Sequence, residues 1–452
     1  MMRLLLLAVV LLFMPARAAA AADAVAAEQR IAEPVFRGEA RLLAAGPPAA
    51  PPVVLIHGIG ARAAGDWDGL IPELAREYRV LAFDLPGFGR SSRRNEPYTP
   101  GNYAAFVRHV IEREFGARPV RIVGHSLGGA IALRYAALHP EQVTALVLVD
   151  VPGLLHRMAY SKHLSHLGID FLPNLYPTQN DHLRNLATSI IGLVEHMQPT
   201  PEAIVVNPKF RKSFLNEDPA KIAGLALALE DFSADLPRVT MPTLLLWGGR
   251  DEIAPLRNGQ TLAAMLPNAA LEVFPASGHT PMDDVPVTFN ARVREFLADS
   301  RLPGADRLPV LMPVSTRNGS CRRQRGAAFE GDYDTLVISR CRGVVVRNAR
   351  VRELRVEESA VVIEHSMIGG RDGGLVVDDA RVSITASRIE APVAIRALGA
   401  RLDIAGSRII GGTAAIEATQ ESQALFSLSE LTSPHRSGRM HGLWQVRPGE
   451  PL

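Results

Sequence analysis

Cysteine is almost absent from this sequence of 452 residues, which contains two cysteines, Cys321 and Cys341. The first 320 residues therefore have no thiol at all. In an oxidising compartment the two cysteines would close a small loop through a disulfide. Two free buried thiols are the alternative, because a sequence does not show whether two side chains have the geometry of a disulfide.

An excess of charge of either sign is also missing. The chain has 49 Lys and Arg against 47 Asp and Glu, a formal net charge of +2. Binding to nucleic acid or to an acidic membrane surface usually requires a marked basic excess, so we expect no nucleic-acid partner. The apolar content of 47% is ample for burial. Because 452 residues exceed what one hydrophobic core usually organises, we expect two folded units.

Long apolar runs are absent after the N-terminus. Arg3 precedes an apolar run over residues 4–14, which is shorter than the roughly 20 residues that span a bilayer. A short apolar core after a positive start, followed by Ala16-Arg17-Ala18, is typical of a cleaved signal peptide. We therefore expect a signal peptide over residues 1–22 and a periplasmic or secreted protein. An uncleaved membrane anchor is the alternative.

Short apolar runs alternate with longer amphipathic stretches between residues 52 and 297, which predicts a mostly parallel sheet covered by helices. The expected strands cover residues 53–56, 80–83, 120–123, 146–149, 243–247 and 271–274. Residues 151–238 contain no comparable run, and the amphipathic stretches 187–196 and 220–233 predict helices. The sequence thus predicts an α/β domain over residues 23–300 with an inserted helical cap at 151–238.

A repeat follows a proline-containing linker at residues 301–320. Segments 361–368, 382–389, 402–409 and 424–431 align with one another, and an earlier copy starts near Val346. The alignment stacks three sets of residues, namely Ile363, Ile384, Ile404 and Phe426; Ser366, Ser387, Ser407 and Ser429; and Ile368, Ile389, Ile409 and Leu431. A fixed period of 20 to 22 residues indicates a solenoid, and we expect an all-β parallel β-helix over 321–432 with a tail at 433–452.

The alternation of apolar residues changes phase inside each repeat. Val361 and Ile363 occupy odd positions, whereas the stacked Ser366 and Ile368 occupy even ones, so a single strand cannot contain all four. A corner at the serine explains the switch. The alternative, a β-sandwich, predicts no fixed repeat. The acidic residues of the repeats fall at different register positions, which favours a solvated face over a polysaccharide-cleaving site; they are Glu364, Asp378, Asp379, Glu390 and Asp403.

A candidate nucleophile lies in Gly124-His125-Ser126-Leu127-Gly128. The pentapeptide follows an expected strand and precedes a helical stretch, which is the placement of a nucleophile elbow. Glycines beside the serine allow the strand and the helix to approach closely and leave the hydroxyl exposed. A glycine-rich turn with an idle serine is the alternative.

A serine hydroxyl needs a base, and the base needs a carboxylate that holds it in one tautomer. Asp251 and His279 each follow an expected strand, at the edge where sites of parallel α/β sheets form. Asp150, which ends the strand at 146–149, is the rival acid. His125 adjoins the nucleophile and is expected to point away from it.

The segment His57-Gly58-Ile59-Gly60 follows the strand at 53–56 and predicts an oxyanion hole. We expect the backbone amides of Ile59 and Leu127 to face the developing oxyanion, with Gly60 as a substitute for Ile59.

Together with Asp84-Leu85-Pro86-Gly87-Phe88-Gly89-Arg90-Ser91, these motifs resemble the α/β-hydrolase fold superfamily over residues 52–297. The resemblance implies a serine triad, an oxyanion hole and a cap over the pocket. Serine at position 126, where epoxide and halide members of the family carry aspartate, implies acyl transfer to water. Nothing in the resemblance covers the repeats.

We therefore expect an exported serine hydrolase that cleaves a carboxylic ester or similar acyl bond of a small molecule, without a cofactor. A carbon–carbon bond hydrolase or a perhydrolase on the same triad is an alternative. A third hypothesis is a non-catalytic protein that binds cell-envelope or glycan material through its repeats. His156, His163 and His166 lack a carboxylate partner at ligand spacing, so we expect no metal site there.

Overall fold

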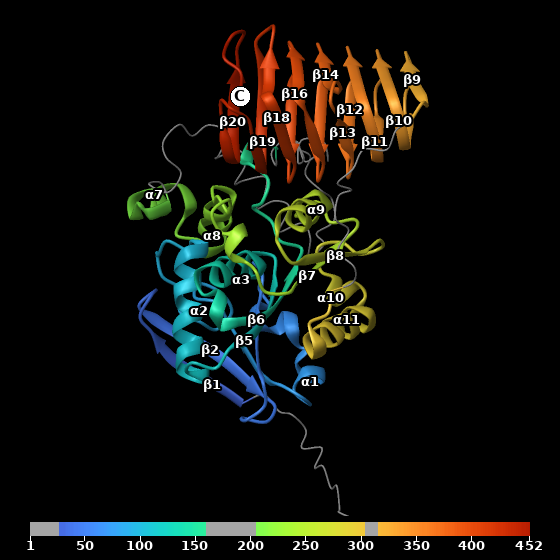
Figure 1. Ribbon diagram of the computed structural model, residues 1–452. Helices are drawn as coiled ribbons and strands as arrows, with labels where there is room; N and C mark the ends of the chain where they lie inside the picture. Colours follow the sequence, from blue (N-terminus) through green and yellow to red (C-terminus); the bar gives the residue numbers. More distant parts are fainter. Residues whose placement is uncertain (1–26, 160–204, 303–314) are drawn as a thin grey trace, which may run out of the picture.

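The computed structural model describes residues 27–159, 205–302 and 315–452, which form an N-terminal α/β domain and a C-terminal β domain (Figure 1). The expected signal peptide, the helix expected at 187–196, His163 and His166 lie outside these residues. Within the described ranges, no helix has the length and apolar character needed to cross a bilayer.

The N-terminal domain is built on a sheet of eight strands in the order β1-β2-β4-β3-β5-β6-β7-β8. The strands are β1 (Ala27–Glu33), β2 (Gly38–Ala45), β3 (Pro52–Ile56), β4 (Arg79–Phe83), β5 (Val120–His125), β6 (Val143–Val149), β7 (Thr243–Gly248) and β8 (Ala269–Phe274). The six strands expected from the sequence are present and parallel. The antiparallel pair β1 and β2 adds an edge that the sequence analysis did not predict.

Helices cover both faces of this sheet. They are α1 (Ile71–Leu74), α2 (Pro100–Phe115), α3 (Leu127–Leu138), α7 (Pro208–Leu215), α8 (Pro219–Ala228), α9 (Leu256–Met265), α10 (Pro281–Asp284) and α11 (Pro286–Asp299), with 3₁₀ turns η1 (Ala63–Trp67), η2 (Pro140–Gln142) and η3 (Leu236–Arg238). In β3, Val54 and Ile56 belong to one apolar cluster and Val53 and Leu55 to another. Successive strand residues point to opposite faces, so a strand covered on both sides is apolar throughout.

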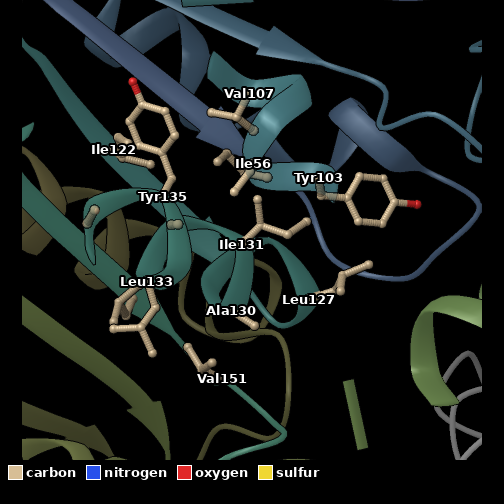
Figure 2. Close-up of a cluster of buried hydrophobic side chains, with 14 of the residues drawn as sticks. Ile56, Tyr103, Val107, Ile122, Leu127, Ala130, Ile131, Leu133, Tyr135 and Val151 are labelled. Carbon is tan, nitrogen blue, oxygen red and sulfur yellow. The ribbon is translucent and has the colours of Figure 1, made fainter. Parts of the chain in front are cut away.

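Helix α3 lies at the centre of the larger cluster, where its side chains pack against β3, α2 and the segment that follows β6 (Figure 2). Ten of its twelve residues are buried. This burial holds the start of α3 rigidly beneath the candidate nucleophile. Helices α7 and α8 belong to the expected cap, and α8 coincides with most of the helix expected at 220–233.

The β domain contains twelve strands, most of them parallel. They are β9 (Asn318–Arg322), β10 (Ala328–Ser339), β11 (Val344–Glu357), β12 (Ala360–Glu364), β13 (Met367–Gly369), β14 (Gly374–Asp378), β15 (Arg381–Thr385), β16 (Arg388–Leu398), β17 (Arg401–Ala405), β18 (Arg408–Ala418), β19 (Ser422–Thr432) and β20 (Ser437–Val446). The repeat register is confirmed, because Ile363 pairs with Ile384, Ile384 with Ile404 and Ile404 with Phe426. The earlier copy is present too, since Val346 pairs with Ile363.

The prediction of a β-helix requires a correction. The pairing runs β11-β12-β15-β17-β19-β18-β16-β13 and returns to β11, so eight parallel strands close into a barrel. In an open β-helix, the strands of the first coil and of the last coil each have one edge without a hydrogen-bonded neighbour. Here the long strand β11 pairs with both β12 and β13, and β19 pairs with both β17 and β18, so hydrogen bonding continues across each end. Strand β20 adds antiparallel to β19.

The expected corner at each stacked serine is present. The residue before the corner position adopts a positive φ in every repeat: His365, Ala386, Gly406 and Leu428 precede the stacked serines, and Asn348 precedes Ala349 in the first copy. The Ser387 hydroxyl accepts a hydrogen bond from the backbone N–H of Ser366 at 3.1 Å and donates to the carbonyl of Thr385 at 2.8 Å. Ser407 and Ser429 repeat this pattern one step later each. The buried hydroxyls thus replace the strand hydrogen bonds that the corner interrupts.

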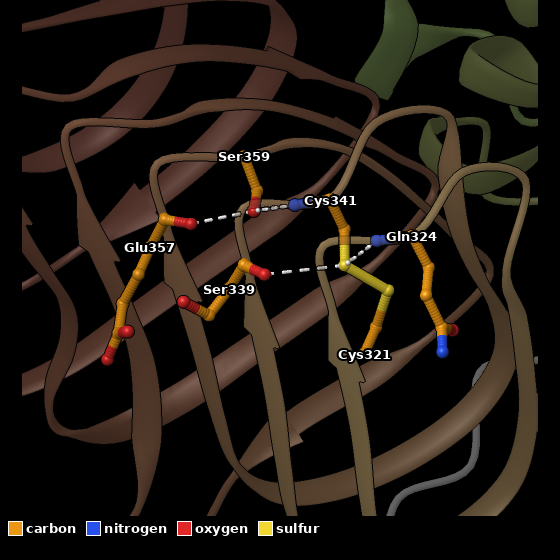
Figure 3. The surroundings of a disulfide bond; sticks show 6 residues. All are labelled: Cys321, Gln324, Ser339, Cys341, Glu357 and Ser359. Atoms are coloured by element: carbon orange, nitrogen blue, oxygen red, sulfur yellow. Dashed lines mark hydrogen bonds between the residues drawn. A yellow bond between two sulfur atoms is a disulfide. The ribbon is translucent and has the colours of Figure 1, made fainter.

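A disulfide joins Cys321 in β9 to Cys341, which follows β10 (Figure 3). Both residues are buried, and their Cα atoms lie 6.5 Å apart, within the range that a disulfide spans. The backbone N–H of Cys341 donates to Ser359 Oγ at 2.8 Å. The bond therefore ties β9 to the next strand at one end of the β domain.

The two domains contact each other through α9 and through the segment that follows β6. Arg257 in α9 donates two hydrogen bonds to the Asp403 carboxylate, at 3.0 and 3.1 Å, and one to Thr385 Oγ1 at 2.8 Å. The backbone N–H of His156 donates to Ser427 Oγ at 2.9 Å. A small apolar cluster made by Leu155, Ala159, Ala405 and Leu425 lies beside these bonds. The β domain is therefore docked on the side of the sheet where the carboxyl ends of β6 and β7 lie.

Candidate active site

The turn between β5 and α3 holds Ser126 in a left-handed conformation, with φ +52° and ψ −122°. The turn depends on small neighbours. A Cβ on Gly124 would lie 2.4 Å from the carbonyl oxygen of Gly128, and a Cβ on Gly128 would lie 2.1 Å from that of Ile56. Neither contact is tolerable, so both positions require glycine. The strand, turn and helix expected around Ser126 are therefore present.

The side chains of Ser126, His279 and Asp251 meet in one line of hydrogen bonds. Ser126 Oγ lies 3.0 Å from His279 Nε2, and His279 Nδ1 lies 2.8 Å from Asp251 Oδ2. Both carboxylate oxygens of Asp251 have partners, since Oδ1 accepts from the N–H groups of Ile253 and Ala254. Because the Asp251 carboxylate accepts a hydrogen bond from His279 Nδ1, the neutral imidazole carries its proton on Nδ1. Its Nε2 is then free to accept a hydrogen bond from the serine hydroxyl.

The expected oxyanion donors lie on the two loops beside Ser126. Gly58 packs so close to Ser126 that a Cβ at Gly58 would lie 2.8 Å from Ser126 Cβ. Leu127 is the first residue of α3, where a backbone N–H has no partner within the helix. Among the described hydrogen bonds, none occupies the N–H of Ile59 or that of Leu127. These amides are thus available to an oxygen bound between the loops.

Two buried histidines support the loops without contacting the serine hydroxyl. His57 Nε2 accepts from the N–H of Leu85, which ties the Ile59 loop to the turn after β4. His125 Nε2 lies 2.7 Å from the carbonyl oxygen of His279 and holds the loop of the candidate base. Burial lowers the pKa of His57 to about 4 and that of His125 to about 3, so both are neutral at pH 7. The sequence analysis missed the role of His125, because a contact between loops 154 residues apart leaves no local signal.

Asp284 is a second residue that the sequence analysis did not identify. Its Oδ2 accepts from Ser277 Oγ and from the N–H of Gly278, both at 2.8 Å. These bonds fix the two residues that precede His279. Only the folding of α10 back onto this loop brings Asp284 there.

The rival acid Asp150 does not contact His279. Its Oδ1 accepts from the N–H of Gly248 at 2.8 Å, and its side chain is hydrogen-bonded to Asp251 instead. The turn at residues 84–91 is held by Asp84, which accepts hydrogen bonds from the N–H groups of Ala64 and Arg90. Phe88 is buried against the ring of His57.

Two of the acidic residues of the repeats pair with arginines. Asp403 binds Arg257 of the N-terminal domain, and Glu390 binds Arg388 on its own strand. The ring of His156 packs at a tilt against that of His441, with ring centroids 5.2 Å apart, at the contact between the domains. Asp403 and Glu390 are therefore engaged in ion pairs with arginines.

Comparison with known families gives a match at the N-terminal domain. A model described as alpha/beta hydrolase fold matches residues 51–286. This range contains Ile59, Ser126, Leu127, Asp251 and His279. It covers slightly more than half of the chain.

Individual relatives match over a similar part of the chain. An uncharacterised protein of Mycobacterium tuberculosis is 28% identical over 309 residues, which are 64% of this chain and 85% of that protein. A 2-hydroxy-6-oxononadienedioate/2-hydroxy-6-oxononatrienedioate hydrolase of Pseudomonas is 29% identical over 259 residues, covering 54% of this chain and 87% of the enzyme. The structure of a thermophilic esterase from Thermogutta terrifontis aligns with 23% identity and a TM-score of 0.44, covering 60% of this chain and 98% of the esterase.

Proposed function

This chain belongs to the α/β hydrolase fold family and is a hydrolase, and we propose that it cleaves carboxylic esters or similar acyl bonds of small molecules through an acyl-enzyme on Ser126. The observation that carries the proposal is the line of hydrogen bonds from Ser126 Oγ through His279 to Asp251, with distances of 3.0 and 2.8 Å. Serine, neutral imidazole and carboxylate in this order form the arrangement that activates a hydroxyl for attack on a carbonyl.

The first half of the reaction forms the acyl-enzyme. Ser126 Oγ attacks the carbonyl carbon of the ester while its proton passes to His279 Nε2, and Asp251 stabilises the resulting imidazolium. The carbonyl oxygen becomes an oxyanion, which accepts hydrogen bonds from the N–H groups of Ile59 and Leu127. The tetrahedral intermediate then expels the alcohol, which takes its proton from His279.

The second half repeats these steps with water. His279 removes a proton from the water molecule as its oxygen attacks the acyl carbon, and the same two amides stabilise the second oxyanion. Collapse of this intermediate releases the carboxylic acid and returns the proton to Ser126 Oγ. All the groups needed belong to loops at the carboxyl ends of β3, β5, β7 and β8, where sites of parallel sheets form.

Turnover of p-nitrophenyl esters by the wild type and by Ser126→Ala tests the proposal. We expect the variant to lose activity by at least about 10³-fold, because the nucleophile is gone. A fluorophosphonate probe should label the wild type and not the variant. Equal turnover by the two proteins, or equal labelling, would refute the role of Ser126. A panel of esters with different acyl and alcohol groups would then rank the substrates.

A second candidate reaction is hydrolysis of a carbon–carbon bond, which the similarity to 2-hydroxy-6-oxo dienedioate hydrolases supports. The same panel distinguishes the two reactions when it includes a 2-hydroxy-6-oxo-dienoate, whose loss is followed by absorbance. Turnover of this compound at a kcat/KM well above that of every ester would favour the second candidate.

We also propose that the protein is exported to the periplasm or secreted. The apolar run at residues 4–14 and the disulfide between Cys321 and Cys341 support this location, because structural disulfides persist in oxidising compartments. N-terminal sequencing of the mature protein tests it. We expect a new N-terminus between residues 19 and 23, and an intact Met1 on a cytoplasmic protein would refute the proposal.

A further inference from the structure

Asp150 is a second buried carboxyl beside the triad. It follows β6 directly, has no solvent exposure and adopts a positive φ of 45°. Its Oδ1 accepts from the N–H of Gly248, and its side chain is hydrogen-bonded to that of Asp251. Within the described residues, its Oδ2 has no donor. A buried acceptor without a donor is unfavourable, unless this oxygen itself carries a proton.

The contact between the two carboxyls requires one proton. An ionised carboxylate only accepts hydrogen bonds, so two ionised carboxylates cannot bond to each other. Asp251 already accepts from three donors, the N–H groups of Ile253 and Ala254 and His279 Nδ1, and a carboxylate has about four acceptor sites. Asp150 accepts from one donor. The ionised form of Asp251 is therefore the better solvated of the two, and the proton belongs on Asp150.

We propose that Asp150 is a positioning residue for the reaction, a neutral carboxylic acid that donates its O–H to the remaining acceptor site of Asp251. This role rests on the proposed function of the triad. Asp150 does not exchange its proton with the substrate. It fixes the plane of the Asp251 carboxylate against His279 and keeps the pair at a single negative charge, which matches the single positive charge of the imidazolium formed during catalysis.

The surroundings of Asp150 agree with this assignment. The groups that face it are Asp251 after β7, Asp284 in α10 and, through Asp251, His279 after β8. Burial and the negative charge of Asp251 hold the pKa of the Asp150 carboxyl well above its ordinary value, and Asp284 acts in the same direction. When Asp150 loses its proton at alkaline pH, the pair carries two negative charges and the hydrogen bond to Asp251 is lost.

Two substitutions of Asp150 distinguish the effect of losing its hydrogen bond to Asp251 from the effect of its positive φ. In Asp150→Asn the amide nitrogen can donate to Asp251 while the amide oxygen accepts from Gly248, and asparagine tolerates a positive φ. In Asp150→Gly the carboxyl is removed and a positive φ carries no strain. Asp235 offers a matched control, because it is also buried with a pKa raised by burial, to about 6, yet its ion-pair partner is Arg134.

Steady-state kinetics of the full chain on a p-nitrophenyl ester should then rank the variants by kcat. We expect Asp150→Asn and Asp235→Asn to retain kcat within about threefold. Asp150→Gly should lose kcat by about 10- to 100-fold with KM changed less than about twofold, the loss of one hydrogen bond to a charged group. An alkaline decrease of kcat present in the wild type should be absent in Asp150→Asn. Equal losses in the Asn and Gly variants, or none in the Gly variant, would overturn the proposal.

Infrared spectroscopy tests the protonation without relying on activity. At pH 7 the difference spectrum of wild type minus Asp150→Asn should contain the C=O stretching band of a protonated carboxylic acid. Absence of this band would overturn the proposal even if the enzyme cleaves esters. Its presence would support a neutral Asp150 even if Ser126→Ala shows that the proposed ester hydrolysis is wrong.

Discussion

The two domains both place non-glycine residues in the left-handed region of backbone space, but they use these positions differently. In the N-terminal domain, Ser126 and Asp150 adopt this conformation beside the candidate site, whereas Asn216 and Ser300 adopt it where α7 and α11 end. In the β domain it recurs at the equivalent corner of successive repeats, for example at His365, Ala386 and Leu428. A positive φ therefore does not by itself indicate a functional site, and its surroundings decide what it means.

Buried polar groups also follow a repeated pattern in the β domain and occur singly in the N-terminal domain. The serines at the corners of the β domain satisfy one another through a regular set of hydrogen bonds. The N-terminal domain instead buries titratable groups, such as His57, His125 and Asp150, each with its own partner. The first pattern contributes stability at many equivalent places, whereas the second concentrates ionisable chemistry at one place. The following experiments test this difference.

The largest effect is expected at Asp251. Asp251→Asn should lower kcat by about 10³- to 10⁴-fold, because an amide at this position can stabilise the wrong tautomer of His279 and cannot balance the imidazolium. Turnover of a p-nitrophenyl ester measures the change. Asp403→Asn in the β domain is the control and should retain kcat within about twofold. Comparable losses in the two variants would show that the β domain takes part in catalysis directly.

Acid should destabilise the N-terminal domain, and His441 in β20, whose pKa is also lowered by burial, acts in the same direction on the β domain. The pKa of His57 is about 4 in the folded chain and 6.5 when unfolded, so between these values the unfolded state binds more protons and stability falls as the pH falls. His57 alone accounts for about 3 kcal/mol by pH 4, and His125 acts in the same direction.

Urea unfolding at pH 7, 6, 5 and 4 measures this loss. Tryptophan fluorescence reports the two domains separately, since Trp67 and Trp247 lie in the N-terminal domain and Trp444 lies in β20. A Trp444→Phe variant isolates the N-terminal signal. Stability of this signal that is independent of pH between 6.5 and 4 would contradict the prediction.

The serine corners should make an intermediate contribution. Ser387→Ala removes the acceptor of the buried Ser366 N–H, which should lower the free energy of unfolding by about 1–3 kcal/mol. Ser383, on the outer face of β15, is the matched control, and its alanine variant should change stability by less than about 0.5 kcal/mol. Urea unfolding compares them. Equal stability of Ser387→Ala and Ser383→Ala would mean that the serine hydrogen bonds do not stabilise the corner.

The smallest effect is expected at the contact between the domains. Arg257→Ala removes the bonds to Asp403 and should destabilise the docked state by about 1 kcal/mol, because the pair is mostly buried and bidentate. Arg340→Ala, at the exposed pair with Glu358, should cost less than about 0.5 kcal/mol. Thermal unfolding detects the difference. A larger loss of stability in Arg340→Ala than in Arg257→Ala would contradict this prediction.

Periodicity made much of the fold predictable. Most of the six parallel strands are apolar on both faces, so they stand out between helices, whereas β1 (AEQRIAE) is mixed in character and was missed. The order of Ser126, Asp251 and His279 was predictable because each follows a strand of one parallel sheet. The contacts of Asp150 with Asp251 and of His125 with the carbonyl of His279 were not, since nothing local in the sequence encodes them.

The sequence by itself determined the six parallel strands of the α/β domain, where each stacked serine turns a corner and which three side chains stand at strand ends. These features depend on local periodicity and on glycine, which neighbouring residues specify. Only the tertiary structure decided that the barrel closes through β11 and β19, that Arg257 docks it on the α/β domain and that Asp150 contacts Asp251. These features depend on distant segments packing together, and their energies come from burial and hydrogen bonds that exist only in the folded chain.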